Sequence, residues 1–240
     1  GANVFTSGDI TIADPLTLLN SITLDSSGGT VSLANVAGST QNLTVNTPVV
    51  TSLAGSIAVN SLITDGGGTL NLGGSLTTSN TTLALGEAVN LTGAMTIATG
   101  TGDLTLTGAI AGAQALTLNS SGTTTLTGGV SVGSLTTDAG GTTSLGNNVT
   151  TTGAQLFQDA VILTQDITLA SSGNGTLTLG NITGTAQTLA LNTGGTTTLN
   201  GTIALGTLTT DGTGTLNLGG TLTTGNTALT LGEAVNLTSA

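Results

Sequence analysis

Six of the eleven acidic residues form three pairs with nearly constant spacing, and they are the side chains best placed to do chemistry. The pairs are Asp65 with Glu87, Asp138 with Asp159, and Asp211 with Glu233, with sequence separations of 22, 21 and 22 positions. Two carboxylates held close together raise a pKa or share a cation, and Ca²⁺ is a cation that takes carboxylate and carbonyl oxygens. These six residues are therefore candidate Ca²⁺ ligands, and the favoured alternative is that they are solvated residues at turns.

The composition excludes most other site chemistry. The chain has no Lys, Arg, His, Cys, Trp or Tyr, and its eleven acidic groups give a net charge of -11. It therefore lacks most general bases, cationic clamps, the nucleophilic thiol and the imidazole metal ligand. We expect no catalytic residue, no enzyme activity and no cofactor other than the candidate Ca²⁺. Nucleic acid and acidic membrane surfaces are excluded as partners, because both are bound through Lys and Arg.

An internal repeat organises the sequence. Residues Leu62 to Thr92 match Leu208 to Thr238 at 25 of 31 positions after a shift of 146 positions. Half of that shift, 73 positions, separates Asp65, Asp138 and Asp211, each of which follows a Leu-Xaa-Thr triplet. Three copies and a fraction fill the sequence. We therefore expect residues 1–240 to form a single segment of stacked units.

Apolar and polar residues alternate in short triplets, which predicts strands. Leu70-Asn-Leu72 and Leu104-Thr-Leu106 are examples, and a period of two with Thr or Asn in the middle is typical of a half-buried strand. Gly, Asn, Asp and Ser between the triplets are turn residues, and no segment has the 3.6-residue apolar spacing of a helix. The residues expected to point inward are Leu70, Leu72, Leu83, Leu85, Val89, Leu91, Leu104, Leu106, Leu116, Leu118, Leu126, Leu177, Leu179, Leu189, Leu191, Leu216, Leu218, Leu229 and Leu231.

The strand spacing predicts an all-β fold, a right-handed parallel β-helix. Nine strands between Val130 and Leu199 divide into three coils of about 24 residues for each repeat. The chain then makes about ten coils and a rod of roughly 48 Å, with paired strands roughly 21 to 27 residues apart. Each acid pair would lie at one corner of adjacent coils, with successive pairs roughly 14 Å apart. No apolar run approaches the roughly 18 residues of a transmembrane helix.

Asparagine also recurs with the repeat. Asn46, Asn119 and Asn192 each follow a predicted strand, and we expect them to adopt left-handed corners and to bond to neighbouring backbone. Asn-Xaa-Thr triplets match the glycan acceptor pattern. In a chain this rich in Asn and Thr, most of these matches are coincidental.

The repeat sequences resemble a known class of surface proteins. The phrases GTLTLGNITGTAQTLALNTGG and GTLNLGGTLTTGNTALTLGEAVNLT are similar in texture to the β-helical repeat regions of filamentous-haemagglutinin-like adhesins and autotransporter passengers of Gram-negative bacteria. The resemblance covers essentially the whole chain and involves no site motif. It implies a right-handed β-helix, export across the outer membrane, an extracellular or cell-surface location, and a role in adhesion, aggregation or biofilm.

Three functions follow as expectations. The leading one is a structural rod of an extracellular adhesin or filament, and the absence of Cys suits a chain that folds after export through an oxidising compartment. The second is a surface-binding solenoid of the ice-binding kind, to which Thr123 to Thr125 and Thr196 to Thr198 point, although such steps are sparse. A β-helical carbohydrate-active enzyme is the least favoured. Neither end carries a recognisable cap, so we expect a longer parent chain or end-to-end self-association.

Overall fold

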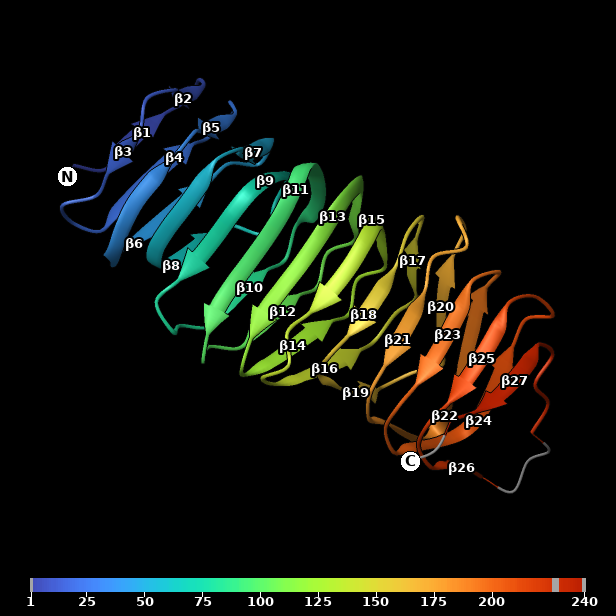
Figure 1. The fold of residues 1–240 in the computed structure, drawn as a ribbon. Coiled ribbons are helices and arrows are strands. Elements are labelled where there is room, and N and C mark those ends of the chain that lie inside the picture. Colours follow the sequence, from blue (N-terminus) through green and yellow to red (C-terminus); the bar gives the residue numbers. More distant parts are fainter. Residues whose placement is uncertain (1, 226–228, 239–240) are drawn as a thin grey trace.

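The computed structural model describes residues 2–225 and 229–238 and is all β in that part of the chain. Its 27 strands stack along one axis as a rod, with the two chain ends at opposite ends of the stack (Figure 1). Every strand pairing in the described residues is parallel and joins consecutive turns of the chain. The fold is a parallel β-solenoid, as predicted, and the right-handed sense stays a prediction.

The strands form three faces of the solenoid. Face A holds β1 (Val4–Thr6), β4 (Ile22–Ser26), β10 (Leu83–Leu85), β12 (Leu104–Leu106), β14 (Thr123–Leu126), β16 (Thr142–Leu145), β19 (Ala160–Leu163) and β26 (Leu222–Thr224). Face B holds β2 (Ile10–Ile12), β5 (Val31–Leu33), β7 (Val50–Leu53), β17 (Val149–Thr151) and β20 (Ile167–Ser171). Face C holds β3 (Leu16–Thr17), β18 (Gln155–Phe157), β21 (Leu177–Leu179), β23 (Thr196–Leu199), β25 (Thr215–Leu218) and β27 (Ala234–Leu237).

Eight longer strands bend around a corner and contribute to two faces each. Those that pass from face C to face A are β6 (Val36–Asn46) and β8 (Ser56–Thr64). Those that pass from face B to face C are β9 (Thr69–Thr78), β11 (Ala88–Gly100), β13 (Ile110–Ser120) and β15 (Val130–Thr137). Those that pass from face A to face B are β22 (Ile182–Thr193) and β24 (Ile203–Thr210). Most of these strands have a register shift at the bend.

The solenoid has about twelve turns, and each is shorter than the sequence pattern predicted. We call a row of residues that pair from one turn to the next a rank. On face C one rank begins at Leu16 and ends at Leu237, with one member in every turn. Paired residues lie between 18 apart, as for Thr143 and Val161, and 22 apart, as for Gln155 and Leu177. The predicted coil length, the predicted range of strand separations and the predicted total of about ten coils are therefore wrong. At about 4.8 Å per turn the rod is roughly 55 Å long.

The error arose from strands that bend. Between Asp65 and Asp138 the chain makes eleven strand segments, because β9, β11, β13 and β15 each supply two. Eleven segments on three faces equal three turns and two-thirds, whereas the sequence pattern from Val130 to Leu199 predicts nine strands for one repeat. Equivalent residues of successive repeats therefore fall on successive faces: Asp65 follows face A, Asp138 follows face C and Asp211 follows face B.

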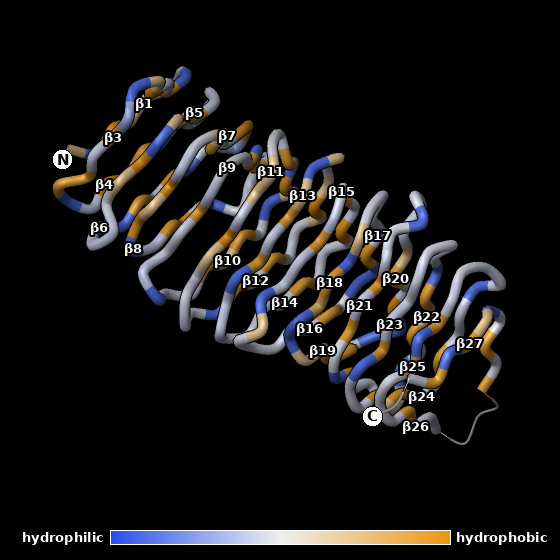
Figure 2. Tube along the Cα trace, in the orientation of Figure 1, coloured by the Kyte–Doolittle hydropathy of each residue, from blue (hydrophilic) through white to orange (hydrophobic). Residues whose placement is uncertain are grey.

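The core is a stack of aliphatic side chains along the axis. Hydrophobic and hydrophilic residues alternate along the strands (Figure 2), and the predicted inward residues from Leu70 to Leu216 are all buried. Leu218 and Leu231 are only partly buried, and Leu229 is 44% exposed. All three belong to the last turns, where fewer residues cover them. Sequence alternation predicted the direction of Leu218 and Leu231 correctly, since both pack against the core, but it carries no information on whether another turn covers them.

We predict that Leu106→Asp strongly destabilises the fold. Leu106 is 1% exposed and lies between Leu85 and Leu126 in its rank, so the variant places an unpaired carboxylate in a dry interior at a cost of several kcal/mol, on the order of 4. Chemical denaturation followed by circular dichroism measures the loss. The control is Thr105→Asp on the outer side of the same strand, which should change stability by less than about 1 kcal/mol. Equal stability of the Leu106 variant and the parent would refute the inward assignment.

Candidate functional site

Each predicted acid pair does lie at one corner of two adjacent turns. Asp65 directly follows β8, and the Gly66 amide beside it donates to Glu87 Oε1 of the next turn at 3.3 Å. Asp138 directly follows β15, whose last residue Thr137 pairs with Phe157, two residues before Asp159. The predicted placement of each pair at one corner of adjacent turns is confirmed.

The three pairs do not share a corner, however. Because the repeat advances by three turns and two-thirds, the pair that begins with Asp65 lies between faces A and B, the pair of Asp138 between faces C and A, and the pair of Asp211 between faces B and C. The prediction that successive pairs are separated by three whole coils, roughly 14 Å, is therefore wrong. The pairs act as three separate local groups.

Hydrogen bonds show that these carboxylates satisfy the backbone of neighbouring turns. Asp159 Oδ1 accepts from the Gly141 amide at 2.9 Å, and its Oδ2 accepts from the Thr143 hydroxyl at 2.9 Å. Asp138 Oδ1 accepts from the Ser120 amide at 3.0 Å. A buried N–H without a partner is costly, so an acceptor that reaches across one turn stabilises a wide corner. The solvated-residue interpretation is thus incomplete, since Asp159 is 2% exposed.

Other Asp and Asn side chains also accept hydrogen bonds from backbone amides of a neighbouring turn. Most of them stand directly before a strand, and the sequence analysis missed them. In each case the side-chain Oδ1 accepts an amide N–H about one turn later in the chain. The donor and acceptor pairs are Thr23 to Asn3, Thr30 to Asp9, Ser56 to Asn35, Thr101 to Asn80, Thr123 to Asp103, Thr168 to Asn148, Thr188 to Asp166 and Thr202 to Asn181. An Asp or Asn directly before an apolar triplet was the signal that identifies most of them.

The recurring Asn residues behave differently from the prediction. Asn46, Asn119 and Asn192 lie within strands β6, β13 and β22, and none has a positive φ. Among the described residues, the Asn residues with a positive φ are Asn80 and Asn174, both at 60°. The predicted left-handed corners at the recurring positions are therefore wrong, because strand pairing with the adjacent turn keeps those residues extended.

Burial raises two of the carboxyl pKa values. The pKa of Asp159 lies above its usual value of 3.8 mainly because the group is buried, with the charge of Asp138 adding to the effect and the bonds from Gly141 and Thr143 opposing it. The pKa of Glu233 is raised by burial and then by the charge of Asp211. No Lys, Arg or His exists in the chain to offset these charges.

The candidate Ca²⁺ sites offer few ligands. Within residues 2–225 and 229–238 no three acidic side chains gather into a group that could hold a metal ion. Ca²⁺ takes six to eight oxygens, and the oxygens of Asp159 already accept hydrogen bonds. At the corner of Asp65, the buried Glu87 Oε2 has no hydrogen-bond partner. Ca²⁺ binding by the six residues stays a prediction.

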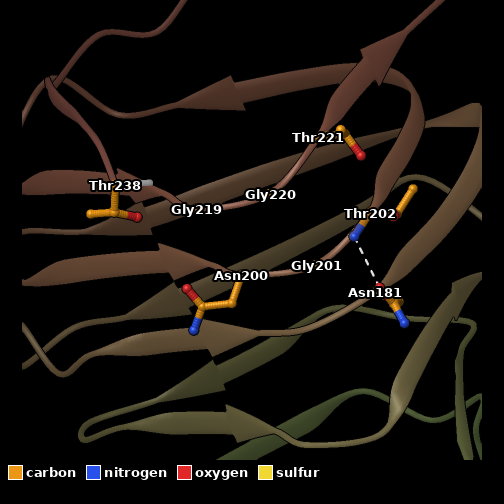
Figure 3. A pocket seen from close by; sticks show the side chains of 8 residues that line it. All are labelled: Asn181, Asn200, Gly201, Thr202, Gly219, Gly220, Thr221 and Thr238. Carbon is orange, nitrogen blue, oxygen red and sulfur yellow. Dashed lines mark hydrogen bonds between the residues drawn. The ribbon is translucent and has the colours of Figure 1, made fainter. Parts of the chain in front are cut away.

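One edge of the rod carries an open, uncharged groove of about 610 Å³ between faces C and A. Figure 3 shows its lining, which consists of Asn181, Asn200, Gly201, Thr202, Gly219, Gly220, Thr221 and Thr238. The Thr202 amide donates to Asn181 Oδ1 at 2.9 Å, which holds that Asn against the wall. Amides, hydroxyls and backbone can exchange hydrogen bonds with water or another neutral polar group, but they provide no general base or activated nucleophile.

Comparison with known proteins identifies no relative. No family model, no curated protein and no solved structure matches the chain. None of the described residues belongs to a helix that is long and apolar enough to cross a membrane.

We predict that acid stabilises the parent chain more than it stabilises Asp159→Asn. A carboxyl whose pKa is raised on folding contributes stability that is fully present below its unfolded pKa and is lost as the pH rises through the folded pKa. The free energy of unfolding of the parent should therefore rise between pH 7 and pH 4, and the amide variant loses part of that rise. Asp14→Asn, which removes one charge at an exposed corner, is the control and should keep it. Identical pH profiles for the parent and the Asp159 variant would contradict the assignment.

Proposed function

We propose that this chain is a structural rod segment of an extracellular bacterial adhesin or filament. The observation that carries the proposal is the unbroken rank from Leu16 to Leu237, one residue per turn over the whole stack. A solenoid whose turns all join the same three ladders is stiff along its axis and transmits load from end to end. Its role is to hold something at a distance, or to form part of a fibre.

The distribution of charge supports a passive rod. Ten of the eleven acidic residues lie outside the strands, and Asp25, the exception, is the next-to-last residue of β4. The outward side chains of the three faces are therefore mostly Thr, Ser, Asn and Ala, and ten of the eleven acidic residues lie at the corners. Charged corners keep the rod soluble and oppose side-by-side clumping.

Export and surface location are supported by composition and by the resemblance of the repeats. The chain has no Cys, which avoids disulfides in an oxidising compartment. A turn-by-turn fold suits a chain that emerges from a membrane in one direction, because each new turn pairs with the previous one. The resemblance of the repeat sequences and the rod shape together support the role in a bacterial adhesin.

The rod and its location require separate tests. Small-angle scattering of the dilute chain should give a cylinder roughly 55 Å long. An antibody raised against the purified chain should label intact cells of the source organism, and external protease should remove the epitope. A compact sphere in solution would overturn the rod, and an epitope reached only after lysis would overturn the surface location.

A second candidate, binding to an ordered surface through threonine, is favoured by one observation. Five Thr residues in six consecutive turns occupy one outward rank of face C, namely Thr96, Thr117, Thr136, Thr178 and Thr198, with Leu156 between the third and fourth. This rank is denser than the sequence indicated. The two Thr-Xaa-Thr steps, however, lie on different faces: Thr123 to Thr125 on face A and Thr196 to Thr198 on face C.

Thermal hysteresis separates this candidate from the rod. If face C binds ice, the parent should depress the freezing point below the melting point, and Thr117→Leu should abolish the effect while Thr105→Leu on face A preserves it. We expect no hysteresis, because the Thr rank is single and interrupted. A clear hysteresis gap that depends on Thr117 would replace the rod with a surface-binding function.

A further inference from the structure

Two asparagines of the chain are followed directly by glycine, namely Asn174 before Gly175 and Asn200 before Gly201. In an Asn-Gly step the backbone nitrogen of the Gly attacks the Asn side chain more readily than in other sequences, because Gly has no Cβ to block the approach and leaves the backbone free to turn. Both asparagines lie outside the strands and are exposed. How the fold holds the attacking nitrogen therefore decides which of the two steps reacts.

The backbone N–H of Gly201 is free to react. Asn200, Gly201 and Thr202 form the corner between β23 and β24, and the next turn continues beyond this corner at residues 219–221. Among the described residues, none accepts a hydrogen bond from the Gly201 N–H, and none bonds to the side-chain amide of Asn200. Figure 3 shows that side chain in the open groove, with no hydrogen bond to the other residues drawn.

The backbone N–H of Gly175 is held in place instead. It donates to the Ser171 hydroxyl at 2.9 Å, and Ser171 is 4% exposed. Attack on the Asn174 side chain must first break this hydrogen bond, which lowers the rate by about tenfold. Asn174 also starts from a left-handed conformation, with a φ of 60°, and has to leave it.

We infer that Asn200 is a site of spontaneous deamidation and that the fold protects Asn174. Solvent hydroxide removes the proton of the Gly201 N–H, so no general base of the chain is needed. The nitrogen then bonds to Cγ of Asn200, the bond from Cγ to the side-chain nitrogen breaks, and ammonia leaves with a proton from water. Water opens the resulting succinimide ring at either carbonyl and gives aspartate or isoaspartate at position 200. A rod needs no such reaction, so this inference goes beyond the proposed function.

The repeat supplies a corner of the same build without the reactive group. Thr127 and Gly128 hold the equivalent positions one repeat earlier, in the corner between β14 and β15. Thr127 and Asn200 each donate a backbone N–H to a carbonyl of the previous turn, both at 3.1 Å. Gly128 and Gly201 both lie so close to that turn that a Cβ would collide with its backbone. Asn200→Thr therefore removes the side-chain amide and keeps the corner.

The two products should differ in their effect on the rod. Aspartate adds one negative charge to a groove whose other lining residues are uncharged, at an exposed position where a charge changes stability little. Isoaspartate also lengthens the main chain by one methylene before Gly201. Because Gly201 already lies against Asn181 without room for a Cβ, the longer chain displaces Thr202 and breaks its hydrogen bond to Asn181. Only the isoaspartyl form is expected to lose stability.

Peptide mapping by mass spectrometry tests the inference. The purified chain is incubated at mildly alkaline pH and then digested with pepsin, because trypsin has no site in a chain without Lys or Arg. We expect conversion at Asn200 to be about tenfold faster than at Asn174. In the chain unfolded by denaturant, the two sites should convert at equal rates. Equal rates in the folded chain, or an Asn200 that stays unchanged there, would overturn the inference.

Variants test the role of the hydrogen bond. Ser171→Ala frees the Gly175 N–H and should raise the rate at Asn174 while the rate at Asn200 stays the same. Circular dichroism checks that this variant remains folded. Continued protection of Asn174 in the folded variant would overturn the hydrogen bond as the cause.

Melting curves test the effect on the corner. Asn200→Thr and Asn200→Asp should both melt like the freshly purified parent. During the incubation the Asn200→Thr variant should keep its melting temperature, whereas that of the parent falls as isoaspartate accumulates. A parent whose melting temperature stays constant while isoaspartate forms would overturn the predicted displacement. These outcomes are independent of the cylinder that scattering measures.

Discussion

The structure depends on one constraint: each turn must place its strands directly over those of the turn before it. All strand hydrogen bonding in the described residues runs between adjacent turns, so a turn that loses its register leaves backbone groups unpaired on three faces. The length of a turn nevertheless varies, with paired residues from 18 to 22 positions apart. The corners absorb this variation, and Asp and Asn side chains satisfy the amides that wider corners leave free. Close stacking also selects glycine: a Cβ on Gly128 would collide with the Gly108 carbonyl below it.

The mismatch between the repeat and the turn explains much of the remaining architecture. A repeat that spans three turns and two-thirds rotates its features by one face at each copy. Thr51, Thr124 and Thr197, for example, are equivalent positions of successive repeats and are all buried, but they lie on faces B, A and C. A feature fixed within the repeat therefore cannot build a continuous ladder along one face. The rank of Thr on face C arises instead from different repeat positions that pairing brings together.

The sequence sufficed to predict the fold class and the direction of most side chains, because strand alternation and turn residues are local signals. The sequence did not suffice to predict the coil length. The segments of β15 before and after Gly133 look like one strand in the sequence, and Ile182 to Gly184 at the start of β22 has one apolar residue. Their separate pairing depends on the turns above and below. The sequence predicted correctly that each acid pair lies at one corner, but it did not predict the role of the carboxylates. Whether Asp159 contacts water or the Gly141 amide depends on how wide the neighbouring corner is.

Acidity and geometry together oppose side-by-side packing of two rods. Within the described residues, pairing between adjacent turns uses the backbone groups of the strands along the sides of the rod. The corners carry nearly all the negative charge, so two rods approaching side by side bring several like charges together along their length. The repulsion therefore grows with the length of a lateral contact, and the chain has no Lys, Arg or His to offset it.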